Sequence, residues 1–148
     1  MFLESITSKN APAAIGPYSP GVKLGDFVYL SGQIALDPNT GELVSADPGE
    51  QTRQVMENIK ALLAEKGLAT HHIVKTTVYL ADLQDFAVFN EIYGSYFTEP
   101  YPARSTIQVA GLPKNAKVEI ECLVLDTLAY EQDSCEGCQS TCDSCPHE

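Results

Sequence analysis

Arg104 is the residue whose type and setting most favour a chemical role. It follows the segment Tyr101-Pro102-Ala103 and stands at the mouth of a predicted strand. Pro102 fixes its own φ and pushes the residue before it toward extended backbone, so the preceding helix has to end here. A guanidinium held at such a corner can donate two parallel hydrogen bonds to a planar carboxylate. An ordinary surface ion pair is the alternative interpretation.

A cysteine cluster near the C-terminal end is the second pattern with chemical potential. Its two C-x-x-C pairs, three residues apart, have metal-ligand spacing, and part of the run has the C-x3-C-x2-C spacing seen in some iron–sulfur proteins. The candidate ligands of a zinc ion or an iron–sulfur cluster are Cys135, Cys138, Cys142 and Cys145. A flexible tail with free or oxidised thiols is the alternative.

Length and charge divide the chain into one ordinary domain and a short acidic tail. Of its 148 residues, we expect 1–128 to fold as a single domain and 129–148 to have no independent fold without metal. The net charge is -11 and only two arginines are present, which argues against nucleic acid as the main partner. No apolar run could span a bilayer and no secretion signal opens the chain, so we expect a cytoplasmic protein without membrane contact.

The elements that must position Arg104 alternate between strands and helices. Asp47 is the expected N-cap of the first helix, which Gly67 ends, and Asp82 is the expected cap of an aromatic second helix that continues toward Pro100. The predicted strands are residues 27–34, a short partner around 42–44, 73–80, 105–110 and 117–125, with a further short strand possible before residue 7. This order predicts an α+β domain of two layers, in which two helices cover one face of a mixed sheet.

Three smaller features concern the surfaces of that sheet. Ser31-Gly32 interrupts the strand 27–34, as a bulge or a close approach of a ligand would. On the last strand Glu119 alternates with apolar residues, so one face of this strand is polar and meets solvent, a pocket or another subunit. Cys122 lies on the apolar face and is expected in the core. Adjacent His71 and His72 are expected to point in divergent directions, which makes them a poor metal motif.

Five motifs, in order and at compatible spacing, resemble the RidA branch of the Rid (YjgF-type) reactive-intermediate deaminases. The resemblance covers about residues 1–127, nearly the whole body of the chain. The motifs are residues 13–19 (AAIGPYS), residues 28–34 (VYLSGQI), the helix residues Asp85, Phe86, Phe89, Asn90, Tyr93, Tyr96 and Phe97, residues 101–105 (YPARS), and Leu112-Pro113 with residues 118–121 (VEIE).

The resemblance implies a fold, an assembly and an activity. The fold would be chorismate-mutase-like (bacillus type), in a homotrimer with pockets between neighbouring subunits. The activity would be hydrolysis of reactive 2-imino or 2-enamino acids, such as 2-iminobutanoate and 2-iminopropanoate, to 2-oxo acids and ammonia. The ligand would be a small imino acid or 2-oxo acid, and no cofactor would be used in catalysis.

The resemblance also implies roles for particular residues. Arg104 would bind the substrate carboxylate, Glu119 would orient the attacking water, and backbone groups near Ser105 and Thr106 would stabilise the tetrahedral carbinolamine. The implied substrate-binding set is Tyr18, Ser31, Asn90, Arg104, Ser105 and Thr106. Thr106 stands where many RidA proteins carry a cysteine. Because imine hydrolysis needs no nucleophilic thiol, we expect threonine to be accepted there.

Two other functions remain open from the sequence. The same Arg104 pocket would serve a non-catalytic trimer that senses or responds to 2-oxo acids, and such a sensor would differ from an enzyme mainly at Glu119. An RNA-directed role, as a translation inhibitor or endoribonuclease, is described for some members of the family. The acidic body counts against this second alternative.

Overall fold

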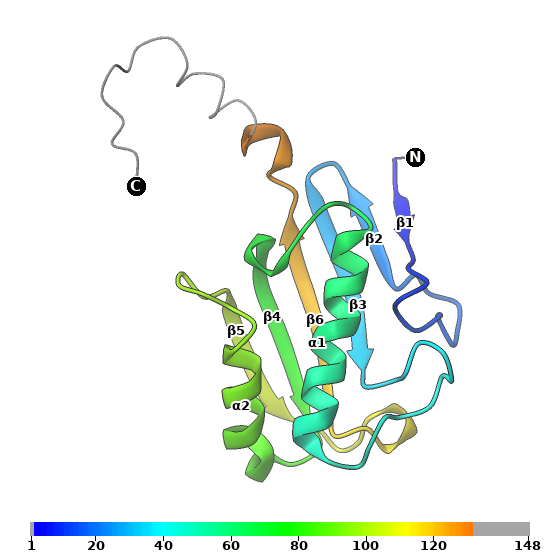
Figure 1. The fold of residues 1–148 in the computed structure, drawn as a ribbon, viewed down its shortest axis with the longest axis vertical. Helices are drawn as coiled ribbons and strands as arrows, with labels where there is room; N and C mark the ends of the chain where they lie inside the picture. Colours follow the sequence, from blue (N-terminus) through cyan, green and yellow to red (C-terminus); the bar gives the residue numbers. More distant parts are fainter. Residues whose placement is uncertain (1, 132–148) are drawn as a thin grey trace, which may run out of the picture.

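The computed structural model describes residues 2–131 of the chain (Figure 1). The strands are β1 (Glu4–Ile6), β2 (Gly21–Leu24), β3 (Phe27–Ile34), β4 (Ile73–Leu80), β5 (Ala103–Gln108) and β6 (Val118–Leu125). The helices are α1 (Pro48–Ala64) and α2 (Phe86–Gly94), and the 3-10 turns are η1 (Thr70–His72), η2 (Leu83–Asp85) and η3 (Pro113–Asn115). Within residues 2–131, no helix is both long and apolar enough to cross a membrane.

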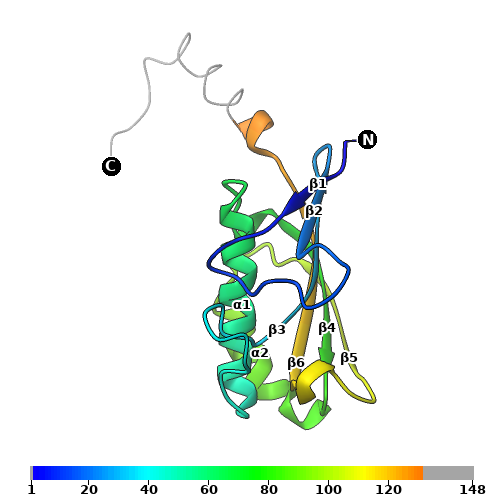
Figure 2. The same ribbon diagram turned by 90° about the vertical axis from the view of Figure 1, so that its right-hand side faces the viewer.

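All six strands form one mixed sheet in the order β1-β2-β3-β6-β4-β5. The β4–β5 pair is parallel and the other pairs are antiparallel. Both helices lie on the same face of the sheet, and no α-helix of residues 2–131 covers the opposite face (Figure 2). The predicted two-layer α+β architecture is confirmed.

The first helix begins where its capping residues predict. Asp47 has extended backbone and its carboxylate accepts a 2.8 Å hydrogen bond from the Glu50 backbone N–H, while Pro48 occupies the first helical position. Its apolar stripe, which includes Val55 and Ile59, is fully buried against the sheet. Gly67 then takes a φ of +69°, which closes the turn after the helix as expected.

The second helix is shorter than the sequence predicted. Asp82 caps η2 instead, by accepting a 2.8 Å hydrogen bond from the Gln84 backbone N–H, and α2 starts only at Phe86. It ends at Gly94, well before Pro100, where the backbone bonds shorten to three-residue turns: the N–H of Tyr96 bonds to the Tyr93 carbonyl and that of Phe97 to the Gly94 carbonyl.

The expected partner of the strand 27–34 was wrong. Residues 42–44 contribute only an isolated bridge between Leu36 and Leu43, whereas β3 pairs with β2. The two strands are joined by Gly25 and Asp26, and Gly25 has a φ of +59°. A two-residue loop that begins with glycine is a hairpin signal, so this connection was readable in the sequence.

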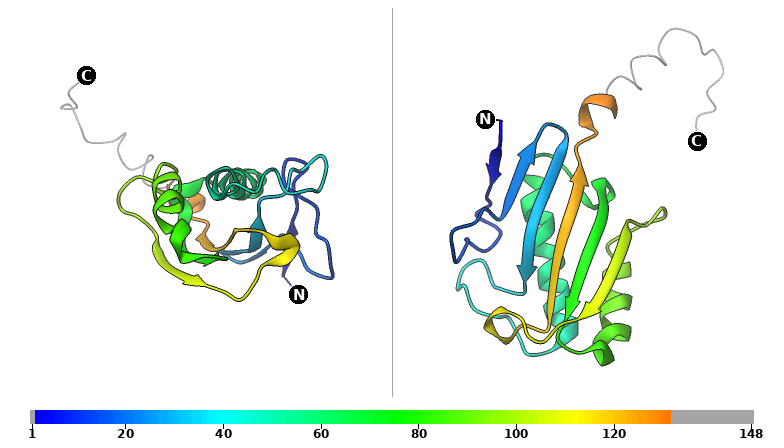
Figure 3. Two further views of the ribbon diagram at one scale, coloured as in Figure 1. Left: turned by 90° about the horizontal axis from the view of Figure 1, so that it is seen from below. Right: turned by 180° about the vertical axis from the view of Figure 1, so that it is seen from behind.

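The last strand places its two faces as its alternation predicts. Ile120 and Cys122 are buried under the helices, and Cys122 belongs to the main core. The open face of the sheet, seen in the right-hand view of Figure 3, carries half-exposed apolar side chains that include Phe27, Tyr29 and Ile107. Such a face is suited to contact with further subunits, and the homotrimer stays a prediction.

Candidate active site

A bulge in β3 forms the floor of the first candidate site. Leu30 pairs with Cys122 and Gln33 pairs with Ile120, so Ser31 and Gly32 together oppose one residue of β6. The Gln33 side-chain amide donates a 3.0 Å hydrogen bond to the Ser31 carbonyl, which fixes the irregular backbone. The Ser31 hydroxyl donates to the Ser19 carbonyl at 2.7 Å and ties the bulge to the preceding loop.

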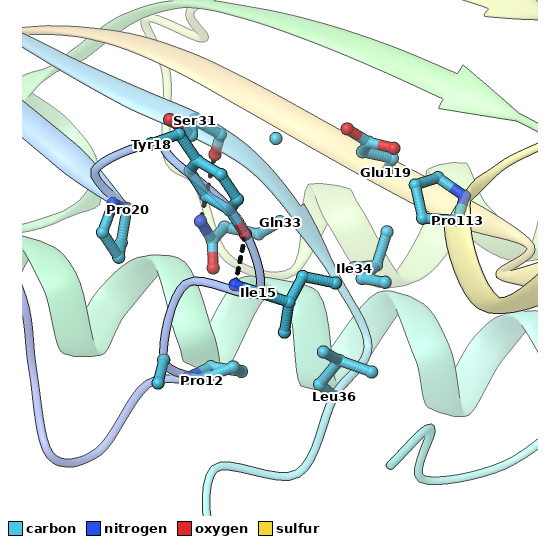
Figure 4. Close-up of a pocket in the computed structure, with 12 residues that line it drawn as sticks. Pro12, Ile15, Tyr18, Pro20, Ser31, Gln33, Ile34, Leu36, Pro113 and Glu119 are labelled. Carbon is cyan, nitrogen blue, oxygen red and sulfur yellow. Dashed lines mark hydrogen bonds between the residues drawn. The ribbon is translucent and has the colours of Figure 1, made fainter. Parts of the chain in front are cut away.

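Tyr18, Ser31 and Glu119 meet in one cavity of about 300 Å³. Figure 4 shows their side chains between the loop before β2 and the strands β3 and β6. The Tyr18 hydroxyl accepts a 3.5 Å hydrogen bond from the Ile15 backbone N–H, which ties the ring to the loop before β2. The remaining lining is mostly apolar: Pro12, Ala13, Ile15, Pro20, Gly32, Gln33, Ile34, Leu36 and Pro113.

Glu119 is the acidic group of this cavity. Its side chain is half-buried, and none of the described residues donates a hydrogen bond to its carboxylate. Burial, with a further contribution from the neighbouring charge of Glu121, raises the pKa of Glu119 above its ordinary value. A desolvated carboxylate with open acceptor positions can hold a water molecule and accept its proton.

Arg104 lies in a second cavity, of about 490 Å³, with Asn90, Tyr93, Gly94, Tyr101 and Pro102. Its Nη2 donates a 2.9 Å hydrogen bond to the Asn90 side-chain oxygen. The guanidinium carbon also lies 4.9 Å from the centre of the Tyr93 ring, so two residues of α2 orient the planar group.

No carboxylate among residues 2–131 forms an ion pair with Arg104. The alternative interpretation of Arg104, as one half of an ordinary surface ion pair, therefore finds no partner within these residues. The ring centres of Phe86 and Phe89 lie 5.6 and 5.7 Å from the guanidinium carbon. From the sequence, these two rings had no role beyond their place in the helix motif that resembles RidA proteins. The three- and four-residue spacing of Phe86, Phe89 and Tyr93 shows only that they share one face of α2 with Asn90.

Ser105 and Thr106 lie on opposite faces of β5. Ser105 is level with Thr77 and is exposed on the open face of the sheet. Thr106 is level with Val78 on the helix side, the same side as Arg104. Its hydroxyl oxygen is buried and has no hydrogen-bond partner among the described residues.

Arg104 and Glu119 point to opposite faces of the sheet. Arg104 is level with Thr76 of β4, and Glu119 is level with Tyr79 of the same strand. Successive residues of a strand alternate between faces, so positions three apart on β4 face opposite ways. One chain therefore contains an arginine half-site and a glutamate half-site in separate cavities. The predicted tail ligands Cys135, Cys138, Cys142 and Cys145 lie outside the described residues.

Comparison with known proteins gives one consistent family. Residues 8–125 match the family model described as Endoribonuclease L-PSP. The chain is 50% identical over 125 residues to the 2-iminobutanoate/2-iminopropanoate deaminase of Escherichia coli strain K12, covering 82% of this chain and 97% of that protein.

Solved structures agree with this assignment. The RidA structure from Psychrobacter sp. PAMC 21119 has a TM-score of 0.80 at 48% identity, covering 82% of this chain and 98% of that one. The structure of Escherichia coli TdcF with bound serine has a TM-score of 0.79 at 47% identity, with the same coverage of 82% and 98%. The chain therefore belongs to the Endoribonuclease L-PSP family, in its RidA (YjgF-type) branch.

Proposed function

We propose that the protein is an imine deaminase that hydrolyses 2-imino and 2-enamino acids to 2-oxo acids and ammonia. Water adds across the C=N bond to give a carbinolamine, and the C–N bond then breaks to release ammonia. The name of the half-identical Escherichia coli relative supports 2-iminobutanoate and 2-iminopropanoate as substrates. The serine in the TdcF structure supports a ligand that carries an α-carboxylate.

The observation that carries this proposal is the setting of Arg104. Its guanidinium is fixed by Asn90 and Tyr93, and it has donors left over beside an open cavity. Two parallel N–H donors match a carboxylate, and binding it would hold the adjacent imine carbon in one place. Asn90 then acts as support for the arginine and forms one side of the substrate site.

Glu119 would position the attacking water on the other side of the substrate. Its carboxylate has no donor from the described residues, and Tyr18 and Ser31 lie in the same cavity. As a base it would accept a proton from the water and return it to the leaving nitrogen. Backbone groups of β5 at Ser105 and Thr106 would stabilise the carbinolamine, since β5 is an edge strand with one side unpaired.

Two copies of the chain would be needed to complete this site. Arg104 and Glu119 lie on opposite faces of one sheet, so a single substrate would meet the arginine of one copy and the glutamate of its neighbour. A closed homotrimer repeats such a heterologous contact three times. Hydrolysis involves no change in oxidation state, so the proposed reaction calls for no cofactor; a zinc or iron–sulfur group in the tail remains a separate prediction.

The direct test measures loss of 2-iminobutanoate as a pyridoxal-phosphate-dependent threonine dehydratase produces it. Semicarbazide competes for the imine, so a deaminase lowers the yield of semicarbazone. We expect the wild-type protein to do so and Arg104→Ala to have no effect on the yield. Wild-type protein that leaves the yield unchanged would contradict the proposed activity, and binding of a 2-oxo acid without turnover would indicate the sensor.

Complementation between two impaired variants tests the shared site. In trimers co-expressed from Arg104→Ala and Glu119→Gln chains, random mixing leaves about a quarter of the interfaces with both native residues. We expect about that fraction of wild-type activity, well above the activity of either variant alone. If the mixed protein stays inactive although both chains are present in its trimers, the two residues do not act across an interface.

The ribonuclease in the family description is the competing activity. Arg104 is the one basic residue that lines either cavity, and a single arginine is a poor track for a phosphate backbone. RNA cleavage that survives both Arg104→Ala and Glu119→Gln would show a site other than the one described here. Loss of cleavage in both variants would instead place that activity in the same pocket.

A further inference from the structure

Two carboxamide side chains, those of Gln51 and Asn58, are buried on the side of α1 that faces the sheet. They are 1% and 0% exposed, and their spacing places them on one face of the helix, about two turns from each other. A buried amide is costly unless its donors and acceptors are paired. Both amides are paired, and their partners outside α1 are all backbone groups, on β3, on the loop that follows β3 and on the residue before β6.

Asn58 fixes the point at which β3 leaves the sheet. Its Nδ2 donates to the carbonyl oxygens of Ile34 at 3.3 Å and of Leu36 at 3.0 Å, where a 2.8 Å backbone hydrogen bond between the same two residues turns the chain sharply. Gln54 donates to the Asn58 Oδ1 at 2.9 Å and so fixes which way round the amide lies. Ile34 and Leu36 both line the Glu119 cavity, and Ile34 is level with Glu119 in the β3–β6 register. Asn58 therefore holds the cavity wall beside the carboxylate.

Gln51 fixes the point at which β6 enters the sheet. Its Oε1 accepts a 2.7 Å hydrogen bond from the backbone N–H of Lys117, which stands two residues before Glu119. The Lys117 carbonyl accepts a 3.0 Å hydrogen bond from the Ala81 N–H just after β4, so both backbone groups of Lys117 are bound. The Gln51 Nε2 donates to the Ser45 carbonyl at 2.8 Å, which ties the same amide to the loop after β3. The strand therefore begins in one orientation, with Glu119 directed into its cavity.

Glu119 depends on this support because its own carboxylate has little. None of the described residues donates a hydrogen bond to it, and its oxygens lie over Gly32, which has no side chain to hold them. Arg104 differs in this respect, since side chains of α2 hold its guanidinium directly. The strand backbone and the cavity wall thus set the position of Glu119, and Gln51 and Asn58 hold both.

We propose that Gln51 and Asn58 are positioning residues for Glu119, a role that rests on the proposed function of that carboxylate as the group that orients water. Neither amide lines the cavity, so neither touches the substrate. Figure 1 shows α1 lying across β3 and β6, whereas the Arg104 cavity lies at α2 and β5. A change at either amide should therefore disturb the glutamate half-site and leave the arginine half-site intact.

The test uses variants of the full-length protein in the coupled imine assay, at a temperature well below their melting temperatures. Asn58→Ala removes the bonds to the end of β3, and Gln51→Met keeps the side-chain length but removes the bond to Lys117. We expect kcat to fall about tenfold in each, since a shift of about 1 Å in a catalytic group costs about a hundredfold and the strands still pack on α1. The affinity for 2-oxobutanoate, measured by calorimetric titration, should stay within about twofold because Arg104 binds its carboxylate.

Thr52→Val is the matched control. Thr52 is fully buried on the same helix, and its hydroxyl donates a 2.7 Å hydrogen bond to the Pro48 carbonyl within α1. Its loss should lower the melting temperature but leave kcat unchanged, because this bond reaches neither strand. If kcat falls in step with the melting temperature in all three variants, Gln51 and Asn58 are ordinary structural residues and the proposal is wrong.

A double-mutant cycle shows whether the effect passes through Glu119. Glu119→Gln protein has no carboxylate to position, so adding Asn58→Ala should lower its residual turnover by less than about twofold. If Asn58→Ala does not fold, the same cycle is measured with Gln51→Met. Losses that multiply, or an unchanged kcat in the folded single variants, would overturn the proposal while leaving the proposed function intact. Wild-type protein without imine turnover would contradict the proposed function itself.

Discussion

The Glu119 carboxylate lies directly against the α-carbon of Gly32. A β-carbon added at Gly32 would be 2.0 Å from Oε1 of Glu119 and 2.8 Å from its carboxyl carbon. The backbone at Gly32 has no positive φ, so the glycine matters here because a side chain would push the Glu119 carboxylate out of its place.

Gly32→Ala should therefore displace Glu119 without disturbing the core. We expect imine turnover to fall by about a hundredfold, since a shift of about 1 Å in a catalytic group can cost that much. Gly111→Ala is the matched control, because an added β-carbon there meets no atom within 4 Å. The coupled imine assay and a thermal melt would be measured for both variants. Full activity in Gly32→Ala would show that the position of Glu119 is not critical.

Arg104→Lys tests whether the planar guanidinium is required, beyond its charge. Lysine keeps the charge but lacks the two parallel donors and does not stack on aromatic rings in the same way. We expect kcat/KM for the imine to fall by about a hundredfold and the affinity for a 2-oxo acid to fall with it. Arg53→Lys, an exposed position on α1, should leave both quantities unchanged. Equal activity in Arg104→Lys would reduce the role of Arg104 to its charge.

The pH dependence of turnover should reflect the ionisation of Glu119. Burial raises the pKa of this carboxyl above its ordinary value of 4.5, so it takes up a proton earlier as the pH falls. Because the ionised form orients the water, activity should be lost as the pH falls through that raised pKa. The measurement is kcat/KM from neutral pH downward. Glu119→Gln should keep a low activity without this acidic limb, and an identical limb in the variant would assign it to another group.

Much of the layer structure followed from local patterns in the sequence. The cap at Asp47 and the alternation along β6 each depend on neighbouring residues, so both were predictable. The end of α2 and the β2–β3 hairpin were missed for different reasons. The change to three-residue turns after Gly94 stops α2 earlier than Pro100 requires, and the four residues of β2 are too few to show a period. The expectation that His71 and His72 point in divergent directions was also wrong, because the turn η1 brings their ring centres within 4.0 Å of each other.

The candidate site was only partly accessible from sequence. Arg104 stood out because a proline fixes the backbone next to it, whereas the aromatic support under its guanidinium requires knowing that α2 crosses β5. The separation of Arg104 from Glu119 depends on strand register across β4, which no local pattern reveals. The hydrogen bonds from the buried amides of Gln51 and Asn58 to strand backbone join residues far apart in the chain and were equally invisible.

Cys122 should take no part in the chemistry. It is buried in the core, and burial raises the pKa of its thiol to about 12. At pH 8 this leaves about a thousandfold less thiolate than an ordinary exposed cysteine has. In a variant whose tail cysteines are serines, iodoacetamide should therefore modify the protein only after unfolding, as mass spectrometry would show. Rapid labelling of the native protein would mean that the core opens at β6.

Thr106 should serve the site through its backbone. Its hydroxyl oxygen is buried without a partner among the described residues, so replacing it by a methyl group removes a desolvated polar atom at no cost in hydrogen bonds. Thr106→Val keeps the β-branched shape that favours β5. We expect imine turnover within about threefold of wild type and an equal or higher melting temperature. Thr106→Cys should behave alike. A loss of turnover in Thr106→Val that leaves the melting temperature unchanged would show instead that the hydroxyl contacts the substrate or the carbinolamine, and the Thr106→Cys variant would then tell whether a weaker donor can replace it.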